Sequence, residues 1–383
     1  MKQIFFGAQI FDGKSFIADH ALITDGPVIV GLVPVADRPR AGIQHDLGGG
    51  LLSPGLIDVQ INGGGGVLLN ETPTVKGIST ILEAHRRFGT THALPTLITD
   101  APALLSETLA AGKMALGFVP GYLGLHIEGP FIDPKRAGAH PPQLIRPLTK
   151  ADADALIKGK AGVLFVTLAP NSVPPTLIAY LTAAGIVVSL GHSDARDDET
   201  FAAIEAGASA ITHLYNAMSP LNQRSAGMVG AALADPRVIA GLIADGHHVS
   251  PTAIRVALAA KGPDGIALVS DAMPPAAGGP AHFELQGRTA SRMGTKLTLP
   301  DGTLAGSTLT MLDAVRYLVR EIGIDVALAL RMATLTPARM LRLDHHYGRL
   351  APGYSSSVVH LGDDLTVKGV WIDGLAYPST SPR

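Results

Sequence analysis

The chain has 383 residues, enough for a barrel-sized domain of about 250 residues plus a smaller module. Its net charge of −2 and pI near 6.7 give no electrostatic reason to expect nucleic acid or an anionic membrane as a partner. Cysteine is absent, which excludes disulfides and thiolate chemistry and fits a reducing, cytoplasmic compartment. Mean hydropathy is +0.28. No apolar run reaches the roughly 18 uncharged residues of a membrane helix, so buried parallel strands explain the hydrophobicity better.

The two ends of the chain share a pattern of short strands. Residues 1–52 contain KQIFFGAQIF, an Asp12-Gly13 turn and HALITDGPVIVGLVP, and residues 343–383 contain GRLAPGYSSSVVHLGDD and TVKGVWIDGLAYP. Alternating apolar residues joined by Asp-Gly turns are typical of hairpins. We therefore expect one small β-module, a sandwich built from both termini, with two separate β caps as the alternative.

Residues 53–342 alternate between apolar runs and helical patterns. Helical patterns end at Gly89, Gly185 and Gly207, and Ser250 followed by Pro251 opens another that closes near Gly262. Eight strands with intervening helices predict an α/β fold, a parallel (β/α)₈ barrel, with a doubly wound sheet as the alternative. The eight apolar runs are 56–60, 92–96, 122–128, 163–168, 186–191, 210–213, 238–244 and 266–270.

Four of these runs end at a polar residue: Glu128, His192, His213 and Asp271. Parallel strands bring their carboxyl ends to one rim of a barrel, where barrel active sites lie. One carboxylate and two imidazoles suit a divalent metal such as zinc, which in catalytic sites takes three protein ligands and a water. Asp271 then suits a general base for that water, although an ordinary turn cap is the simpler interpretation of this residue.

Further candidates lie on loops around this rim. His140, in RAGAH, can donate a hydrogen bond to an oxyanion, and His126 shares a strand face with Glu128 as a supporting group or a ligand. Arg224 and His248 are candidates for an anionic substrate group, with His247 equally available. The Asn62–Gly66 stretch, NGGGG, lacks the Lys-Ser/Thr of a P-loop, so we interpret it as a permissive turn.

Several motifs together resemble a known family. LLSPGLIDVQING, GLHIEGPFI, AGAH, LGHSDA, THLYNAM, IADGHHV, LVSDAM and TLAGSTLTM occur in the order seen in N-acetylglucosamine-6-phosphate deacetylases of the amidohydrolase superfamily, across about residues 1–360. The resemblance implies a barrel with a small β-sandwich, usually as a homodimer. It also implies hydrolysis of an N-acetyl-amino-sugar phosphate, a linear amide, in amino-sugar metabolism.

The resemblance also implies roles for particular residues. Asp271 corresponds to the catalytic base and acid, and His140 to the histidine that polarises the acetamide carbonyl. Arg224 and His248 correspond to phosphate binders, in some members contributed across the dimer interface. The metal ligands correspond to Glu128, His192 and His213, and the sugar contacts to Ala139, Asn216, Ala217, Leu304, Ala305, Gly306 and Ser307.

The chain departs from the family pattern at two places, one near the expected metal site and one beside the expected phosphate binder. Where many amidohydrolases carry His-x-His and hold two metals, this chain has Gln60-Ile61-Asn62. Because amides are poor zinc ligands, we predict one divalent ion per subunit, zinc before iron or another metal. His247 stands where leucine is common, next to the expected phosphate binder. The alternatives are an N-acetylgalactosamine-6-phosphate deacetylase, another amidohydrolase, or a barrel that serves only as a scaffold.

Overall fold

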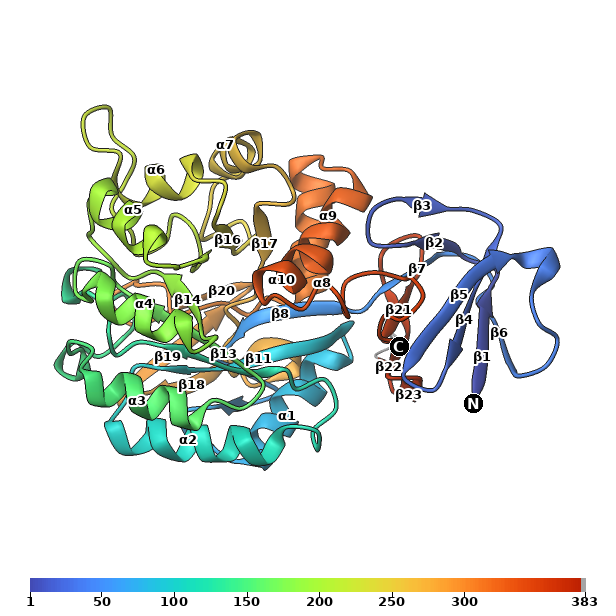
Figure 1. Cartoon of the computed structure of the whole chain (residues 1–383), viewed down its shortest axis with the longest axis horizontal. Coiled ribbons are helices and arrows are strands. Elements are labelled where there is room, and N and C mark those ends of the chain that lie inside the picture. Colours follow the sequence, from blue (N-terminus) through green and yellow to red (C-terminus); the bar gives the residue numbers. More distant parts are fainter. Residues whose placement is uncertain (380–383) are drawn as a thin grey trace.

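The computed structural model describes residues 1–379 and contains an eight-stranded parallel sheet that curls into a barrel (Figure 1). Every neighbouring pair of its strands is parallel, in the order β17-β16-β15-β14-β13-β12-β11-β8. The first and last strands meet where the backbone N–H of Asp271 donates to the carbonyl of Gln60 over 3.0 Å. The strands are β8 Leu56–Ile61, β11 Thr90–Ile98, β12 Gly124–Glu128, β13 Val163–Leu168, β14 Val187–Leu190, β15 Ala210–Ile211, β16 Ile239–Leu242 and β17 Ile266–Leu268.

Helices surround the barrel and bury their apolar sides against it (Figure 1). Local sequence sets several of their starts: Thr74, Thr149, Ser250 and Thr310 each accept a hydrogen bond from a backbone N–H in the first turn. The helices are α1 Val75–Arg86, α2 Pro102–Ala115, α3 Lys150–Gly159, α4 Pro175–Ala183, α5 Asp197–Glu205, α6 Gly227–Ala234, α7 Pro251–Lys261, α8 Met311–Tyr317, α9 Val326–Ala333 and α10 Leu335–Met340. None of the helices in residues 1–379 has both the length and the hydropathy to cross a membrane.

Both ends of the chain build one β-module beside the barrel, where the blue and dark red strands of Figure 1 pack together. A six-stranded sheet, β23-β22-β21-β7-β2-β3, joins strands from the two ends, and a four-stranded sheet, β5-β4-β1-β6, completes the module. The interpretation as two separate caps is therefore wrong. These strands are β1 Lys2–Phe6, β2 Gln9–Phe11, β3 Phe16–Ile17, β4 His20–Asp25, β5 Val28–Pro34, β6 Ile43–Asp46, β7 Leu51–Pro54, β21 Val358–Leu361, β22 Val367–Ile372 and β23 Leu375–Tyr377.

The predicted barrel is confirmed, and each of the eight apolar runs overlaps one strand of it. Some elements are shorter than predicted. KQIFFGAQIF forms two strands in different sheets, because Gly7 with φ +81° turns the chain between β1 and β2. The domain limits at 52/53 and 342/343 stay predicted boundaries, and residues 380–383 of the terminal segment lie outside the described part.

A three-stranded antiparallel sheet beside the mouth of the barrel was not predicted: β18 His282–Leu285, β19 Arg288–Met293 and β20 Lys296–Thr298. Its inner side chains, among them Leu285, Ala290 and Leu297, pack with Met273 in a separate apolar cluster. Two short strands, β9 Gly63–Gly64 and β10 Val67–Leu68, follow β8. Gly65 and Gly66, with φ of +58° and +88°, make the permissive turn expected for the glycine stretch.

Candidate active site

A cavity of about 230 Å³ lies at the carboxyl ends of the barrel strands. Side chains at the strand ends line it, together with residues of the loops after β12, β15, β16 and β17. Its lining residues are Asn62, Ile98, Glu128, Gly138, Ala139, His140, His192, His213, Asn216, Ala217, Ile243, His248, Asp271, Met273, Thr303, Leu304 and Gly306.

Three of the four predicted strand-end residues have an unusual backbone. The φ angles of His192, His213 and Asp271 are +47°, +28° and +50°, in the left-handed region that residues other than glycine seldom adopt. Such conformations cost free energy and cluster at functional sites, where the surrounding structure maintains them. Each turns the chain sharply as its strand ends, so that the side chain enters the cavity.

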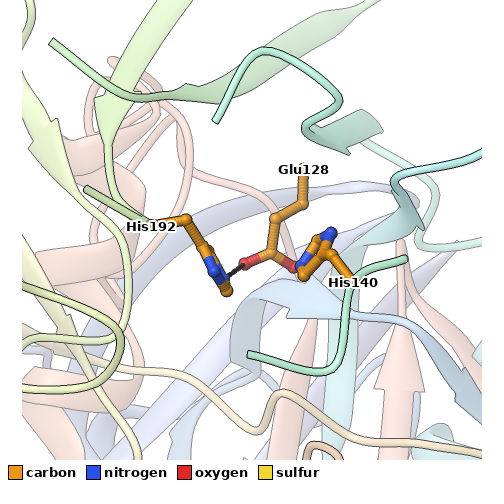
Figure 2. Close-up of side chains that lie close together, drawn as sticks. All are labelled: Glu128, His140 and His192. Carbon is orange, nitrogen blue, oxygen red and sulfur yellow. Dashed lines mark ion pairs between the residues drawn. The ribbon is translucent and has the colours of Figure 1, made fainter. Parts of the chain in front are cut away.

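The predicted ligand atoms converge. The Nε2 atoms of His192 and His213 lie 3.2 and 3.1 Å from Oε1 of Glu128 and 3.0 Å from each other. Figure 2 shows Glu128 between His192 and His140. A ring nitrogen of His140 lies within 4.8 Å of the ligand atoms of Glu128 and His192, so His140 belongs to the same cluster. All four side chains are buried, with at most 5% of each residue exposed.

The protonation of His192 leaves its inner nitrogen available as a ligand. Its Nδ1 donates a hydrogen bond to the backbone carbonyl of Arg136 at 2.9 Å, so Nε2 carries the lone pair of the neutral ring. The Arg136 side chain in turn pairs with Asp194 at 2.7 Å, which holds the loop that supplies this carbonyl. This is the arrangement by which metal-binding histidines are usually oriented.

The donor set fits a divalent ion. Four ligands about 2.1 Å from a tetrahedral ion lie roughly 3.4 Å from one another, close to the separations of the three predicted ligand atoms. Burial would raise the pKa of Glu128, but the adjacent imidazoles of His192 and His213 hold it well below its usual range. Nδ1 of His213 is buried without a hydrogen-bond partner in residues 1–379. One buried charged carboxylate facing two imidazoles is a site that calls for a cation.

His140 is prepared as a donor rather than as a ligand. Its Nδ1 accepts the backbone N–H of Thr99 at 3.3 Å and lies 2.8 Å from the Thr99 hydroxyl. The proton of the neutral ring therefore sits on Nε2. Burial, followed by repulsion from His192, lowers the pKa of His140 to about 3, which keeps the ring neutral near pH 7. A neutral Nε2–H can donate a hydrogen bond to an oxygen in the cavity.

Asp271 is held by the two amides that replace His-x-His. Asn62 Nδ2 and Gln60 Nε2 donate to its Oδ1 at 2.6 and 3.2 Å, and Gln60 also donates to Glu128 at 3.0 Å. No hydrogen bond to Oδ2 occurs among the described residues, so this oxygen remains free to exchange a proton. Burial, followed by repulsion from Glu128, raises the pKa of Asp271 to about 6.

His126 lies one layer below this group. It points into the barrel, where Nε2 contacts the Thr167 hydroxyl at 2.7 Å and Nδ1 contacts the Thr96 hydroxyl at 3.3 Å. Thr167 continues to the hydroxyl of Thr212 at 2.7 Å. Burial lowers the pKa of His126 to about 4. These contacts engage both ring nitrogens, which favours the prediction of a supporting group over that of a ligand.

The predicted sugar contacts divide into two sets. Ala139, Asn216, Ala217, Leu304 and Gly306 line the cavity. Ala305 and Ser307 do not: Ala305 packs in the apolar cluster beside the mouth, and the Ser307 hydroxyl donates to the backbone carbonyl of Ser270 at 2.6 Å. The Leu304–Ser307 segment thus alternates between residues that face the cavity and residues that anchor it.

Of the two predicted phosphate binders, only one reaches the cavity. His248 lines it, while His247 is exposed and contacts the Thr295 hydroxyl at 2.8 Å, so the structure distinguishes between the two neighbours. Arg224 lies exposed in the loop before α6 and does not line the cavity. Sequence reasoning missed Asp245, whose carboxylate contacts the Nδ1 atom of His248 on the side away from the cavity. The available signal was an acidic residue three positions before the histidine.

Comparison with known proteins agrees with this geometry. The model of the amidohydrolase family matches residues 51–376. The chain belongs to the amidohydrolase family. Thr99, which fixes the ring of His140, and Met273, which lines the cavity, are further site residues of this amidohydrolase that periodicity and motifs did not single out.

Named relatives cover nearly all of the chain. It is 41% identical to an N-acetylgalactosamine-6-phosphate deacetylase of Shewanella sp. (strain ANA-3), over 98% of this chain and 96% of that protein. It is 38% identical to an N-acetylglucosamine-6-phosphate deacetylase of Homo sapiens, over 88% and 86%. The crystal structure of N-acetylglucosamine-6-phosphate deacetylase from Pasteurella multocida superposes with a TM-score of 0.96 at 34% identity, covering 98% of this chain and all of that one.

Proposed function

We propose that this amidohydrolase removes the acetyl group from N-acetyl-D-glucosamine 6-phosphate, giving D-glucosamine 6-phosphate and acetate, in amino-sugar catabolism. The observation that carries the proposal is the convergence of Glu128, His192 and His213 beside a free carboxylate oxygen of Asp271. The names of the relatives, deacetylases of phosphorylated N-acetylhexosamines, support the substrate class.

Glu128, His192 and His213 would hold one divalent ion per subunit, zinc rather than iron. When bound, such an ion lowers the pKa of a water molecule and polarises a carbonyl oxygen. The nitrogen-rich donor set supports zinc, although iron accepts the same ligands. Gln60 and Asn62 support a single ion, because their amide nitrogens donate to carboxylates and amide oxygens are poor zinc ligands compared with imidazole.

Asp271 is the base and then the acid in this mechanism. It removes one proton from a water molecule whose oxygen forms a bond to the acetyl carbon. The C–N bond then breaks as Asp271 returns that proton to the nitrogen, which leaves as the amine. The other product is acetic acid, which passes its proton to the released amine, so the final products are acetate and the ammonium form of the sugar and the atoms of one water and one amide are balanced.

His140 serves the carbonyl oxygen. Its Nε2–H donates a hydrogen bond where negative charge develops as the carbon becomes tetrahedral. The Thr99 amide supports this assignment, since it leaves Nε2 as the protonated nitrogen.

The sugar would lie against the cavity lining, with the phosphate towards His248. Ala139, Asn216, Ala217, Leu304 and Gly306 are the proposed contact positions, with Ala305 and Ser307 supporting the last two from behind. We propose that His248 donates to the phosphate, because among the described residues it is the only histidine lining this cavity outside the metal group and His140.

Arg224 supports the further proposal of a homodimer. In a single chain its guanidinium is exposed outside the cavity, so a role in phosphate binding requires the site of a second copy. Mixing inactive Arg224→Ala and inactive Asp271→Asn proteins tests this. Subunit exchange should restore activity, since a mixed dimer has one intact site. If mixing restores nothing while mixed dimers form, Arg224 does not act across the interface.

A cytoplasmic location is also proposed, supported by the absence of cysteine from the sequence. Cell fractionation with antibody detection is the test, and recovery in a secreted or membrane fraction would contradict it.

The test of the function is release of acetate from paired substrates by the metal-loaded protein. N-acetylglucosamine 6-phosphate should be hydrolysed with a much higher kcat/KM than unphosphorylated N-acetylglucosamine. N-acetylgalactosamine 6-phosphate is the second candidate, favoured by the name of the relative from Shewanella, and belongs in the same assay. Equal turnover with and without phosphate would instead favour a different amidohydrolase.

A further inference from the structure

Behind His248 lies a buried carboxylate that no role assigned so far requires. Oδ2 of Asp245 and Nδ1 of His248 are 2.7 Å apart, and only 4% and 6% of these two side chains are exposed. Oδ1 of Asp245 accepts the backbone N–H groups of His247 and His248 at 2.8 and 2.9 Å. Burial would raise the pKa of Asp245, but its hydrogen bond with His248 lowers it, so the carboxylate is charged.

This contact determines what His248 can offer to the cavity. A charged carboxylate only accepts hydrogen bonds, so Nδ1 of His248 must carry a proton. If the ring were neutral, Nε2 would then hold a lone pair and would repel a phosphate oxygen. The imidazolium form satisfies both anions at once, because it has an N–H group towards each.

No other residue described in the cavity lining offers a positive charge to an anionic substrate group. His192 and His213 face Glu128, and Nδ1 of His140 accepts the backbone N–H of Thr99, so that ring is neutral. Arg224 does not line the cavity of its own chain. Within residues 1–379, His248 is therefore the one side chain lining this cavity that is free to bring a positive charge to an anionic substrate group.

The backbone supports the same geometry. Gly246 has a φ of +80°, and a Cβ at this position would lie 3.0 Å from the ring of Tyr317. The turn from Asp245 to His248 is thus fixed by a glycine and by two hydrogen bonds that backbone N–H groups donate to the Asp245 carboxylate. An Asn at position 245 keeps an oxygen for those two amides, and loses only the oxygen that faces His248.

We infer that Asp245 is the positioning residue that makes His248 a cationic phosphate anchor and thereby sets the preference of the enzyme for phosphorylated sugars. The inference rests on the proposed function. It assigns to Asp245 no contact with substrate, only the orientation and the charge of the ring that makes this contact. If Asp245 merely stabilised the loop, its replacement would lower kcat/KM equally for phosphorylated and unphosphorylated substrates.

The test compares Asp245→Asn with the wild type, using metal-loaded enzyme. The measured quantity is the ratio of kcat/KM for N-acetylglucosamine 6-phosphate to kcat/KM for N-acetylglucosamine. We expect this ratio to fall about tenfold, the usual difference between a charged and a neutral hydrogen bond, through a rise in KM for the phosphorylated sugar. His247→Gln is the matched control, because His247 contacts Thr295 outside the cavity, and its ratio should equal that of the wild type.

An unchanged ratio, with both substrates slowed alike, would overturn the inference and reduce Asp245 to a loop residue. Inorganic phosphate as a competitive inhibitor is the second measurement, which requires no turnover of the unphosphorylated sugar. Its inhibition constant should rise about tenfold in Asp245→Asn, and an unchanged constant overturns the inference too. If the wild type releases no acetate, the proposed function fails, and calorimetric binding of inorganic phosphate to wild type and variant still tests Asp245.

Discussion

At the scale of single residues, backbone strain marks the site more sharply than side-chain type does. The chain has 14 histidines, and type alone does not separate His192 and His213 from the others. Their positive φ angles, shared by Asp271, show that the fold holds these residues in conformations that cost free energy. The sequence predicted the positions because each ends an apolar run, but the strain is a property of the turn that follows.

Replacing Asp271 by Asn tests the proposed base. The amide is nearly isosteric but takes up no proton, so kcat should fall by about 10²–10⁴-fold while the metal remains bound. Acetate release and metal analysis on the same preparation measure both. Asp235→Asn is the control: Asp235 is also buried but pairs with Arg237, and its activity should be that of the wild type. A kcat near the wild-type value in Asp271→Asn would contradict the assignment.

The pH dependence follows from the same carboxyl group. Burial, followed by repulsion from Glu128, raises the pKa of Asp271 to about 6, so its basic form is lost as the pH falls through that region. A bound cation favours the charged carboxylate of Asp271, so protonation of this carboxylate then occurs at lower pH. We therefore expect kcat/KM to decline on the acid side with a midpoint at or below pH 6. A midpoint of pH 7 or above would identify another group as the base.

At the scale of elements, the eight barrel strands were predictable because buried parallel strands are continuous apolar runs. The sheet β18–β20 was not, since HFELQGRTASRMGTKLT has few apolar residues, and only the contact of Leu285, Ala290 and Leu297 with Met273 gives it an inner face. The ends of β14 and β15 were also shorter than predicted, because the residues after them form the turns that carry His192 and His213.

The strand that delivers Glu128 depends on a glycine at its start. Gly124 has a φ of +149°, and a Cβ there would lie 1.9 Å from the carbonyl oxygen of Val163, so the neighbouring strand must move to admit a methyl group. We expect Gly124→Ala to lower the free energy of unfolding by about 3 kcal/mol or more. Denaturant unfolding of the variant measures this loss.

Gly117→Ala separates the backbone angle from the clash. Gly117 has a φ of +74° with no atom within 4 Å of an added Cβ, so its replacement should cost only about 1–2 kcal/mol. Equal losses in the two variants would show that the contact between β12 and β13 is not what requires glycine at position 124.

At the scale of the whole molecule, the candidate site is assembled from strand ends that lie far apart along the chain. Glu128, His192, His213 and Asp271 meet because a closed parallel sheet brings its carboxyl ends to one rim. This convergence could be predicted from the order of the strands. The contacts that orient these groups could not: the hydrogen bonds between His192 and the Arg136 carbonyl, between His140 and the Thr99 amide, and between His248 and Asp245 depend on loops whose paths no periodicity encodes.

The most direct test of the account is the metal content of the purified protein and of its ligand variants after loading with zinc. The wild type should bind one ion per chain, and Asp271→Asn should bind the same amount. Glu128→Gln, His192→Ala and His213→Ala should each bind zinc at least about tenfold more weakly and lose acetate release with it. Full zinc binding with wild-type affinity in any of these three variants, or none in the wild type, would contradict the proposed metal centre.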